Sequence, residues 1–176
     1  MVNRANLHFK MAELADTEFD KSDHYFDCAT WLRLALSRSE DLPDAQYLLG
    51  HLYENGLSVD KNIPAAYECF KKAADLGCRK SNTKVGHYLY SGIKQHSYGE
   101  LNLDEVDHLS TEEDISLLGA GADRYHILPD RRMALKRYLK SSKMGDSEAC
   151  NCAALMLEHD NPIDAVELYK RGLELD

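Results

Sequence analysis

The sequence has no long apolar run and few helix-breaking residues among its 176 positions. No stretch reaches the roughly 18 consecutive apolar residues of a membrane-spanning helix, so direct membrane insertion is not expected. The first 25 residues are interspersed with charges and lack the apolar core of a secretory signal. Four prolines and ten glycines are too few for a linker-rich or all-β chain of this length. These absences favour a helical protein without an export signal.

Basic residues are the minority among the charged ones. Lys and Arg total 21 against 30 Asp and Glu, which gives a net charge of −9. Proteins bind DNA or RNA largely through Lys and Arg that displace phosphate counterions. The excess of acids therefore argues against a nucleic-acid partner and favours partners that are themselves basic.

Cysteine is sparse and odd in number, with five residues. Without a secretory signal, this indicates reduced thiols in a cytosol-like compartment. Cys150 and Cys152 would point about 200° apart on a helix and could not share a metal, so we expect the cysteines to be small packing residues. The prediction is a cytoplasmic protein. A mitochondrial or other organellar location is the alternative, because the first twelve residues hold Arg4 and Lys10 and no acid.

An internal repeat stands out against these absences. Segment 45–56, AQYLLGHLYENG, returns 36 residues later at 81–92 as SNTKVGHYLYSG. A second pattern, AYECFKKAADLG at 66–77, returns at 134–145 as ALKRYLKSSKMG and more weakly at 165–176. A fixed period of this length is typical of arrays of helix pairs.

The residue types of the repeat explain why each copy would form two packed helices. Ala45, Leu49 and Leu52 lie at helical spacing and form one apolar face. Gly50 lies inside that helix, where glycine costs about 1 kcal/mol relative to alanine. This cost makes sense if a neighbouring helix approaches closely, and Asn62 is placed to cap that neighbour.

These residues resemble the Sel1-like repeat, a relative of the TPR. The matching positions are Ala45, Leu49, Gly50, Tyr53, Gly56, Val59, Ala66, Phe70, Ala73, Ala74 and Gly77, with departures at Ser58, Asn62 and Cys69. The resemblance implies an all-α solenoid, a right-handed superhelix of about four Sel1-like or TPR-like helix pairs. It also implies a role as an adaptor, as Sel1-like proteins have in ER-associated degradation, chitin-synthase activation and bacterial host interaction.

The predicted array occupies residues 1–176 as a single unit. Its helix pairs cover 4–38, 44–77, 80–92 with 130–145, and 146–176. An insertion at 93–129 separates the two helices of the third pair and carries eight acids against two basic residues, a net charge of −6. Within it, Ser110 would cap a short helix at 111–118, and Ser110 and Thr111 followed by acids are candidate phosphorylation sites.

The sequence shows no established catalytic motif. A nucleophile elbow, a Walker motif and an H-E-x-x-H pair are all missing. Gly119 and Gly121 lack the third glycine of a phosphate loop. His51 and His87 could share a metal with Glu54, but a recurring groove-facing histidine is the favoured interpretation. The other histidines form no ligand-spaced cluster: His8, His24, His96, His108, His126 and His159. We therefore expect no enzyme activity, no cofactor and no metal.

The predicted function is a non-enzymatic adaptor or scaffold that binds a protein or peptide through the concave face lined by the first helices. By analogy with TPR groove positions, this face would hold Tyr47, His51, Glu54, Asn55, Thr83, His87, Tyr90, Asn151, Leu155 and Glu158, with Phe9, Glu13 and Asp16 from the first pair. Aromatic residues beside acids favour a partner segment with a basic residue next to an apolar one. The acidic insertion could also contribute.

An architectural subunit of a larger assembly, with an unused groove, is the alternative function. The last predicted helix would leave Val166, Leu173 and Leu175 without a covering repeat. Such an uncovered end favours a continuing array or a second subunit.

Overall fold

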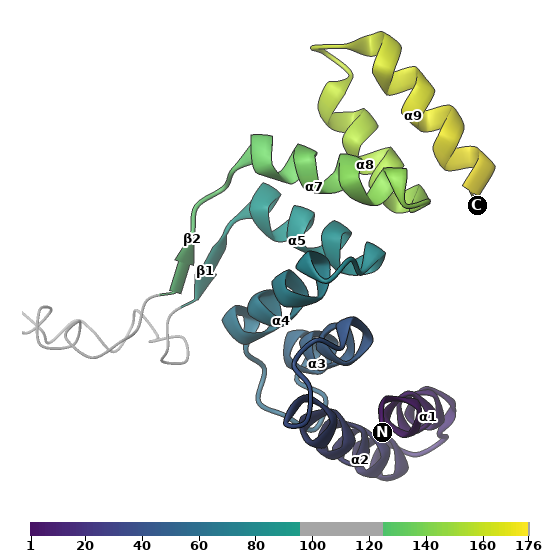
Figure 1. Cartoon of the computed structure of the whole chain (residues 1–176), viewed down its shortest axis with the longest axis vertical. Helices are drawn as coiled ribbons and strands as arrows, with labels where there is room; N and C mark the ends of the chain where they lie inside the picture. Colours follow the sequence, from purple (N-terminus) through teal and green to yellow (C-terminus); the bar gives the residue numbers. More distant parts are fainter. Residues whose placement is uncertain (96–124, 176) are drawn as a thin grey trace, which may run out of the picture.

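The computed structural model describes residues 1–95 and 125–175, and these form eight helices and one small ribbon (Figure 1). The helices are α1 (Val2–Leu14), α2 (Glu18–Leu36), α3 (Pro43–Asn55), α4 (Ile63–Asp75), α5 (Arg79–Ser91), α7 (Arg131–Lys143), α8 (Ser147–Leu157) and α9 (Pro162–Leu175). They pack as the pairs α1–α2, α3–α4, α5–α7 and α8–α9. The expected all-α repeat fold is confirmed.

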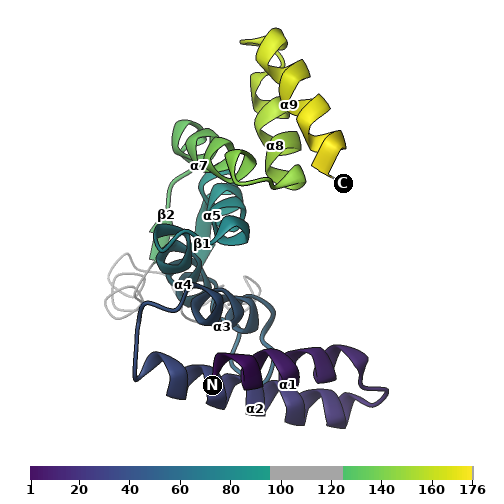
Figure 2. The ribbon, with the colours of Figure 1, turned by 45° about the vertical axis from the view of Figure 1, so that its right-hand side comes forward.

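The pairs stack one after another along a curved path, with α1 and α9 at its two ends (Figures 1 and 2). Each pair also contacts the next, α2 with α3, α4 with α5 and α7 with α8. The first helices of the pairs therefore follow one another along the array. None of the helices in the described ranges is long and apolar enough to cross a membrane.

Side chains at the helix ends satisfy the free backbone groups as the sequence predicts. Asn62 accepts a hydrogen bond from the Ala65 amide at 3.0 Å and begins α4, and Asp130 does the same for Met133 at 2.9 Å. Gly56 ends α3 with a φ of 70°, a left-handed conformation that side chains disfavour. These local signals fix where α4 and α7 begin and where α3 ends.

Close helix contacts inside the pairs explain the mid-helix glycines. A Cβ atom on Gly50 would lie 2.9 Å from the Phe70 ring and 3.2 Å from the Ala66 carbonyl oxygen. A Cβ atom on Gly86 would lie 2.6 Å from the ring of Tyr138. The expectation of a close approach at Gly50 is thus confirmed, and the next pair repeats it.

A two-stranded antiparallel ribbon corrects the expectation of a chain without sheet. Strands β1 (Ile93–Gln95) and β2 (Tyr125–Ile127) pair with Ile93 opposite Ile127. The packing of α5 against α7 brings the two ends of the insertion together, so two short extended segments can pair. Three residues per strand are too few for a recognisable alternation of apolar and polar residues. Ile93 is buried against Phe70 and its neighbours, which anchors the ribbon to the array.

The interior of the expected insertion lies outside the described residues. This applies to the short helix expected at 111–118, to the candidate phosphorylation sites Ser110 and Thr111, and to the acidic residues between 96 and 124. The structure places only the two ends of this segment, at the ribbon between α5 and α7.

Candidate functional site

Two adjoining cavities lie along the first helices of the array. The larger, of about 840 Å³, is lined from α1, α3 and the turn into α5, and the smaller, of about 410 Å³, from α3, α5 and the start of α8. Tyr47, Arg79 and Lys80 line both cavities. We call this continuous hollow the groove.

Aromatic side chains of α1 and α3 form one side of the larger cavity, which we call the aromatic wall. The Tyr47 ring is half-buried and packs on Phe70 with centroids 5.7 Å apart. Phe9 from α1 meets His51 from α3 edge-on at 5.4 Å. Burial lowers the pKa of His51, so this imidazole is uncharged at neutral pH. The wall therefore offers apolar surface with two polar tips, the Tyr47 hydroxyl and the His51 ring nitrogens.

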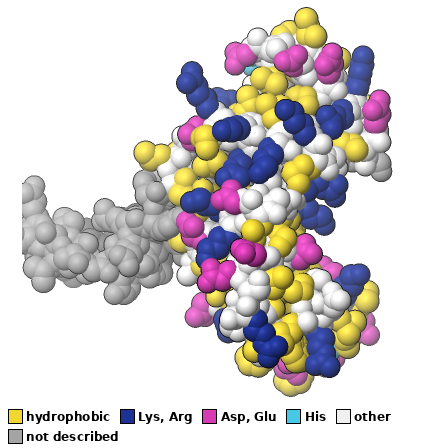
Figure 3. Space-filling view, in the orientation of Figure 1, with side chains coloured by type: hydrophobic (Ala, Val, Ile, Leu, Met, Phe, Trp, Pro, Cys, Tyr) yellow, Lys and Arg dark blue, Asp and Glu magenta, His cyan; other side chains and the backbone are white. Residues whose placement is uncertain are grey.

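Charges of both signs surround this wall. Lys10, Glu13, Asp44 and Lys80 line the larger cavity, and their side chains form no hydrogen bond or ion pair with any other described residue. Arg79 is already engaged, because its guanidinium donates to the Gly145 carbonyl at 2.9 Å. Figure 3 shows basic and acidic side chains interleaved over the visible face of the array. The groove is therefore of mixed charge, whereas the sequence led us to expect aromatic residues beside acids.

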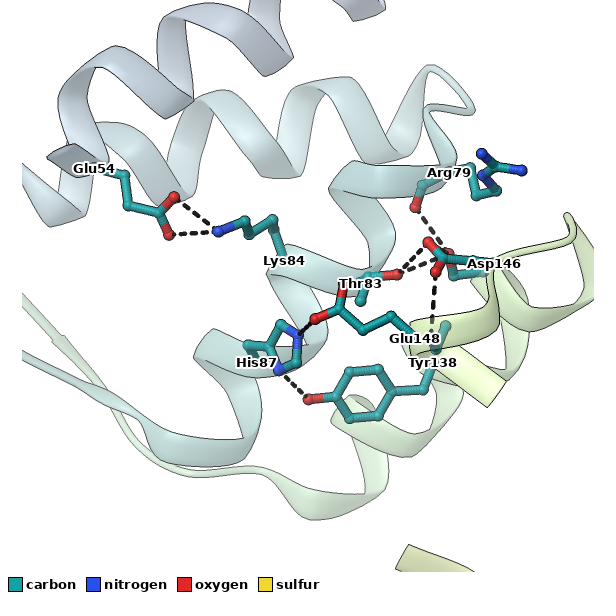
Figure 4. Close-up of polar contacts among 10 residues, drawn as sticks. Glu54, Arg79, Thr83, Lys84, His87, Tyr138, Asp146 and Glu148 are labelled. Atoms are coloured by element: carbon teal, nitrogen blue, oxygen red, sulfur yellow. Dashed lines mark hydrogen bonds and ion pairs between the residues drawn. The ribbon is translucent and has the colours of Figure 1, made fainter. Parts of the chain in front are cut away.

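A polar network fixes the smaller cavity between α5 and α8 (Figure 4). The Thr83 hydroxyl lies 2.9 Å from both Ser141 Oγ and Asp146 Oδ2. His87 lies with Nδ1 3.0 Å from the Tyr138 hydroxyl and Nε2 3.2 Å from Glu148. The contacts with Asp146 and Glu148 hold the third pair against the fourth, and those with Ser141 and Tyr138 join α5 to α7.

A second polar contact joins α3 to α5. The Lys84 ammonium lies 2.9 Å from Glu54, and the Tyr88 hydroxyl donates to the same carboxylate at 2.8 Å. Glu54 is largely buried, with 19% of its side chain exposed. The negative charge of Glu54 is thus balanced by Lys84 within the array.

The predicted groove residues fall into three groups. Phe9, Glu13, Tyr47, His51 and Thr83 line the cavities, although Thr83 is buried and its hydroxyl is engaged. Glu54 and His87 connect neighbouring helices through the contacts described above. The remaining predicted residues do not line the groove: Asn55, Tyr90, Asn151, Leu155, Glu158 and Asp16.

Each of the predicted residues outside the groove is exposed and has its own surroundings. The Asn55 amide donates to the His51 carbonyl at 2.9 Å. Tyr90 lies near the end of α5 with the Arg131 guanidinium 5.5 Å from its ring centroid. Glu158 accepts from the Tyr169 hydroxyl at 3.2 Å. Only the first turn of α8 lines the groove, so Asn151 and Leu155 lie outside it.

The basic residues of the groove were missed by sequence reasoning. Lys10 lies one turn before Glu13 on α1, and Arg79 and Lys80 begin α5. Their positions at the mouth of the groove depend on how α5 packs beside α3. The available signal was the Arg79-Lys80 pair, which follows Gly77 and Cys78 where a new first helix must start.

The histidines also require one correction. His8 and His24 were expected to form no cluster, yet they meet Asp27 between α1 and α2, with possible ligand atoms all within 4.8 Å of one another. Antiparallel pairing brings residues together that are 16 positions apart in the chain. His51 and His87, by contrast, have separate partners. Within the described ranges, the cluster of His8, His24 and Asp27 is the one group of metal-ligating side chains.

The thiols of the five cysteines are free and belong to the helix packing. Cys28 and Cys150 are buried and the other three are partly buried. Burial raises the pKa of Cys28 and of Cys69 to about 11, so both thiols are protonated at neutral pH.

Comparison with known proteins supports this architecture. Residues 43–78, which span α3 and α4, match the family model of the Sel1 repeat. The crystal structure of a Sel1 repeat protein from Oxalobacter formigenes matches the whole chain with a TM-score of 0.68 and 20% identity. This chain spans 56% of that protein.

A second solved structure gives the same result. It is c5321, a protective antigen present in uropathogenic Escherichia coli strains and displaying an SLR fold, which matches 99% of this chain with a TM-score of 0.64 and 18% identity. This chain spans 31% of that protein. No curated protein sequence matches this chain. The chain therefore contains a Sel1 repeat, set in an array of helix pairs with the fold of Sel1 repeat proteins.

Proposed function

We propose that the chain is a non-enzymatic scaffold that binds a segment of a partner protein in the groove. Sel1 repeat proteins generally mediate interactions between proteins. The single observation that carries the proposal for this chain is the position of Tyr47. Its half-buried ring lies where the two cavities join, so a segment that runs along α1, α3 and α5 must cross it.

The energetics of such a contact favour Tyr47 as the anchor. The ring is already packed on Phe70, so little side-chain freedom is lost when a partner covers it. Aromatic side chains in well-packed hollows contribute a large share of binding energy at protein interfaces. Phe9 extends the aromatic wall toward α1.

The charged side chains of the groove that have no partner among the described residues determine which partner segment fits it. Glu13 and Asp44 would accept a basic residue, in agreement with the basic segment expected from the sequence. Lys10 and Lys80 would in turn attract an acidic residue of the same segment. The partner segment is therefore an apolar or aromatic residue flanked by charges of both signs.

Charge reversal at Lys80 tests this proposal with little effect on folding, because Lys80 is exposed. The full chain is used to capture partners from its native source, and captured proteins are quantified by mass spectrometry. A genuine groove partner should be lost with Lys80→Glu and retained with Lys71→Glu, an exposed lysine of α4 outside both cavities. Partners retained equally by both variants would place recognition elsewhere.

The second candidate function, an architectural subunit, has one specific observation in its favour. Apolar side chains of α9 face outward, with Ile163 72% and Leu173 78% exposed, and Leu155 of α8 is 60% exposed. Exposed apolar patches commonly mark interfaces. Sedimentation of the isolated chain distinguishes the two functions. A monomer that unfolds cooperatively supports the scaffold, whereas concentration-dependent aggregation relieved by Leu173→Lys supports the subunit.

A further inference from the structure

A cluster of metal-ligating side chains lies between α1 and α2. His8 comes from the middle of α1, and His24 and Asp27 come from α2. His24 and Asp27 are three residues apart, so they lie on the same face of α2. Because α1 and α2 run side by side (Figure 2), that face meets His8. The cluster has no part in the groove proposed above.

The separations within the cluster suit a transition-metal ion. Zinc bound to nitrogen and oxygen at 2.0–2.2 Å in a tetrahedron places its ligand atoms about 3.4 Å apart. His8 Nδ1 and Asp27 Oδ2 are 3.5 Å apart. All three possible ligand atoms lie within 4.8 Å of one another. Rotation of a side chain that moves the most distant atom by about 1.4 Å would complete the tetrahedral spacing.

One nitrogen atom of the cluster lacks a hydrogen-bond partner among the described residues. This atom is His8 Nδ1, which is buried and has no such partner, although Asp27 Oδ2 lies 3.5 Å away. A buried polar atom without a partner destabilises the fold, because its contacts with water are lost and not replaced. A metal ion on this nitrogen would remove that destabilisation. The Asp27 carboxylate, 53% exposed, would supply charge and give the ion a route from solvent.

We propose that His8, His24 and Asp27 bind one divalent transition-metal ion, with zinc as the representative ion. Two imidazoles and one carboxylate are a ligand set that suits zinc and copper and disfavours calcium and magnesium, which prefer oxygen ligands. Three protein ligands leave a fourth position for water.

The bound ion would join α1 to α2. The fully buried residues of α1 are the two small ones, Ala5 and Ala12, while Val2 and Phe9 pack partly buried against the core. A metal that bridges the two helices binds the folded pair and not the unfolded chain, and it thereby stabilises the pair. The site is a structural clip for the first helix pair.

Titration of the full chain with zinc chloride and with cobalt chloride tests the proposal. We expect one ion per chain by calorimetry, a higher melting temperature with zinc that EDTA reverses, and a tetrahedral cobalt spectrum. His8→Gln, His24→Gln and Asp27→Asn should each weaken binding at least about tenfold. The control His159→Gln, at an exposed histidine beyond α8, should bind as the parent does.

Three results would overturn the proposal. They are no saturable binding, a thiolate-to-cobalt charge-transfer band that assigns the ion to cysteines, and parental affinity in the three variants. Asp27 is the most exposed of the ligands, so Asp27→Asn keeps the test valid if a histidine variant fails to fold. Parental helicity of each variant is checked by circular dichroism.

Discussion

At the scale of single residues, the array depends on a few positions where two helices nearly touch. Gly50 is the clearest case, because its neighbours include a backbone carbonyl that cannot turn aside. Phe70 fills the same contact and is fully buried. The same contact between a glycine and an aromatic ring recurs between Gly86 and Tyr138, so two successive helix pairs pack in the same way.

Gly50→Leu should lower the free energy of unfolding by about 1–3 kcal/mol, because a larger side chain forces strain on a tight contact. The measurement is chemical denaturation followed by circular dichroism. Lys136→Leu, at an exposed position of α7, is the control and should shift stability by less than about 0.5 kcal/mol. Equal midpoints for parent and Gly50→Leu would contradict the close contact.

His51 gives a prediction about pH. Burial lowers its pKa in the folded state, so the unfolded chain takes up a proton at this site more readily. Well above the usual histidine pKa of about 6.5, the protonation of His51 does not change the free energy of unfolding. As the pH falls below that value, it lowers the free energy of unfolding. His51→Gln should therefore lose less stability than the parent between about pH 7 and about pH 5. An equal loss in both proteins, measured by denaturant unfolding, would refute the buried environment.

At the scale of elements, the repeated segments predicted the helices well, and the connections only poorly. The register of 45–56 and 81–92 predicted α3 and α5, because helical spacing and capping are local properties. The ribbon and the metal-ligating cluster depend on contacts between segments distant in the chain. Neither Ile93 opposite Ile127 nor His8 beside Asp27 leaves a local signal.

The ribbon predicts that the insertion is separable from the array. Gln95 and Tyr125 are paired across β1 and β2, so a two-residue turn can join them in place of residues 96–124. The shortened chain should keep the helical signal and the cooperative unfolding of the parent. Loss of cooperative unfolding would show that the replaced segment is needed for the fold. As a control, deletion of 93–127 also removes Ile93 from the core and should destabilise the chain.

At the scale of the whole molecule, the curvature of the stacked helix pairs hollows one face of the array. Helix-pair arrays gain their concave faces from small rotations between neighbours, and here the first helices bring Phe9, Tyr47 and Lys80 to one hollow. The analogy with TPR groove positions led us to expect Phe9 and Tyr47 on this face. It did not identify the basic residues, because Lys10 and Lys80 lie outside the repeated motif.

The affinity of a groove partner for two tyrosine variants tests the central claim most directly. Tyr47 lies at the junction of the cavities, and Tyr90, an exposed tyrosine of the next first helix, lies outside them. By calorimetry, Tyr47→Ala should weaken binding by more than about 1 kcal/mol, roughly fivefold in Kd, while Tyr90→Ala binds as the parent does. Both variants should keep the helical signal. A folded Tyr47→Ala variant with parental affinity, or an equal loss in both variants, would contradict recognition in the groove.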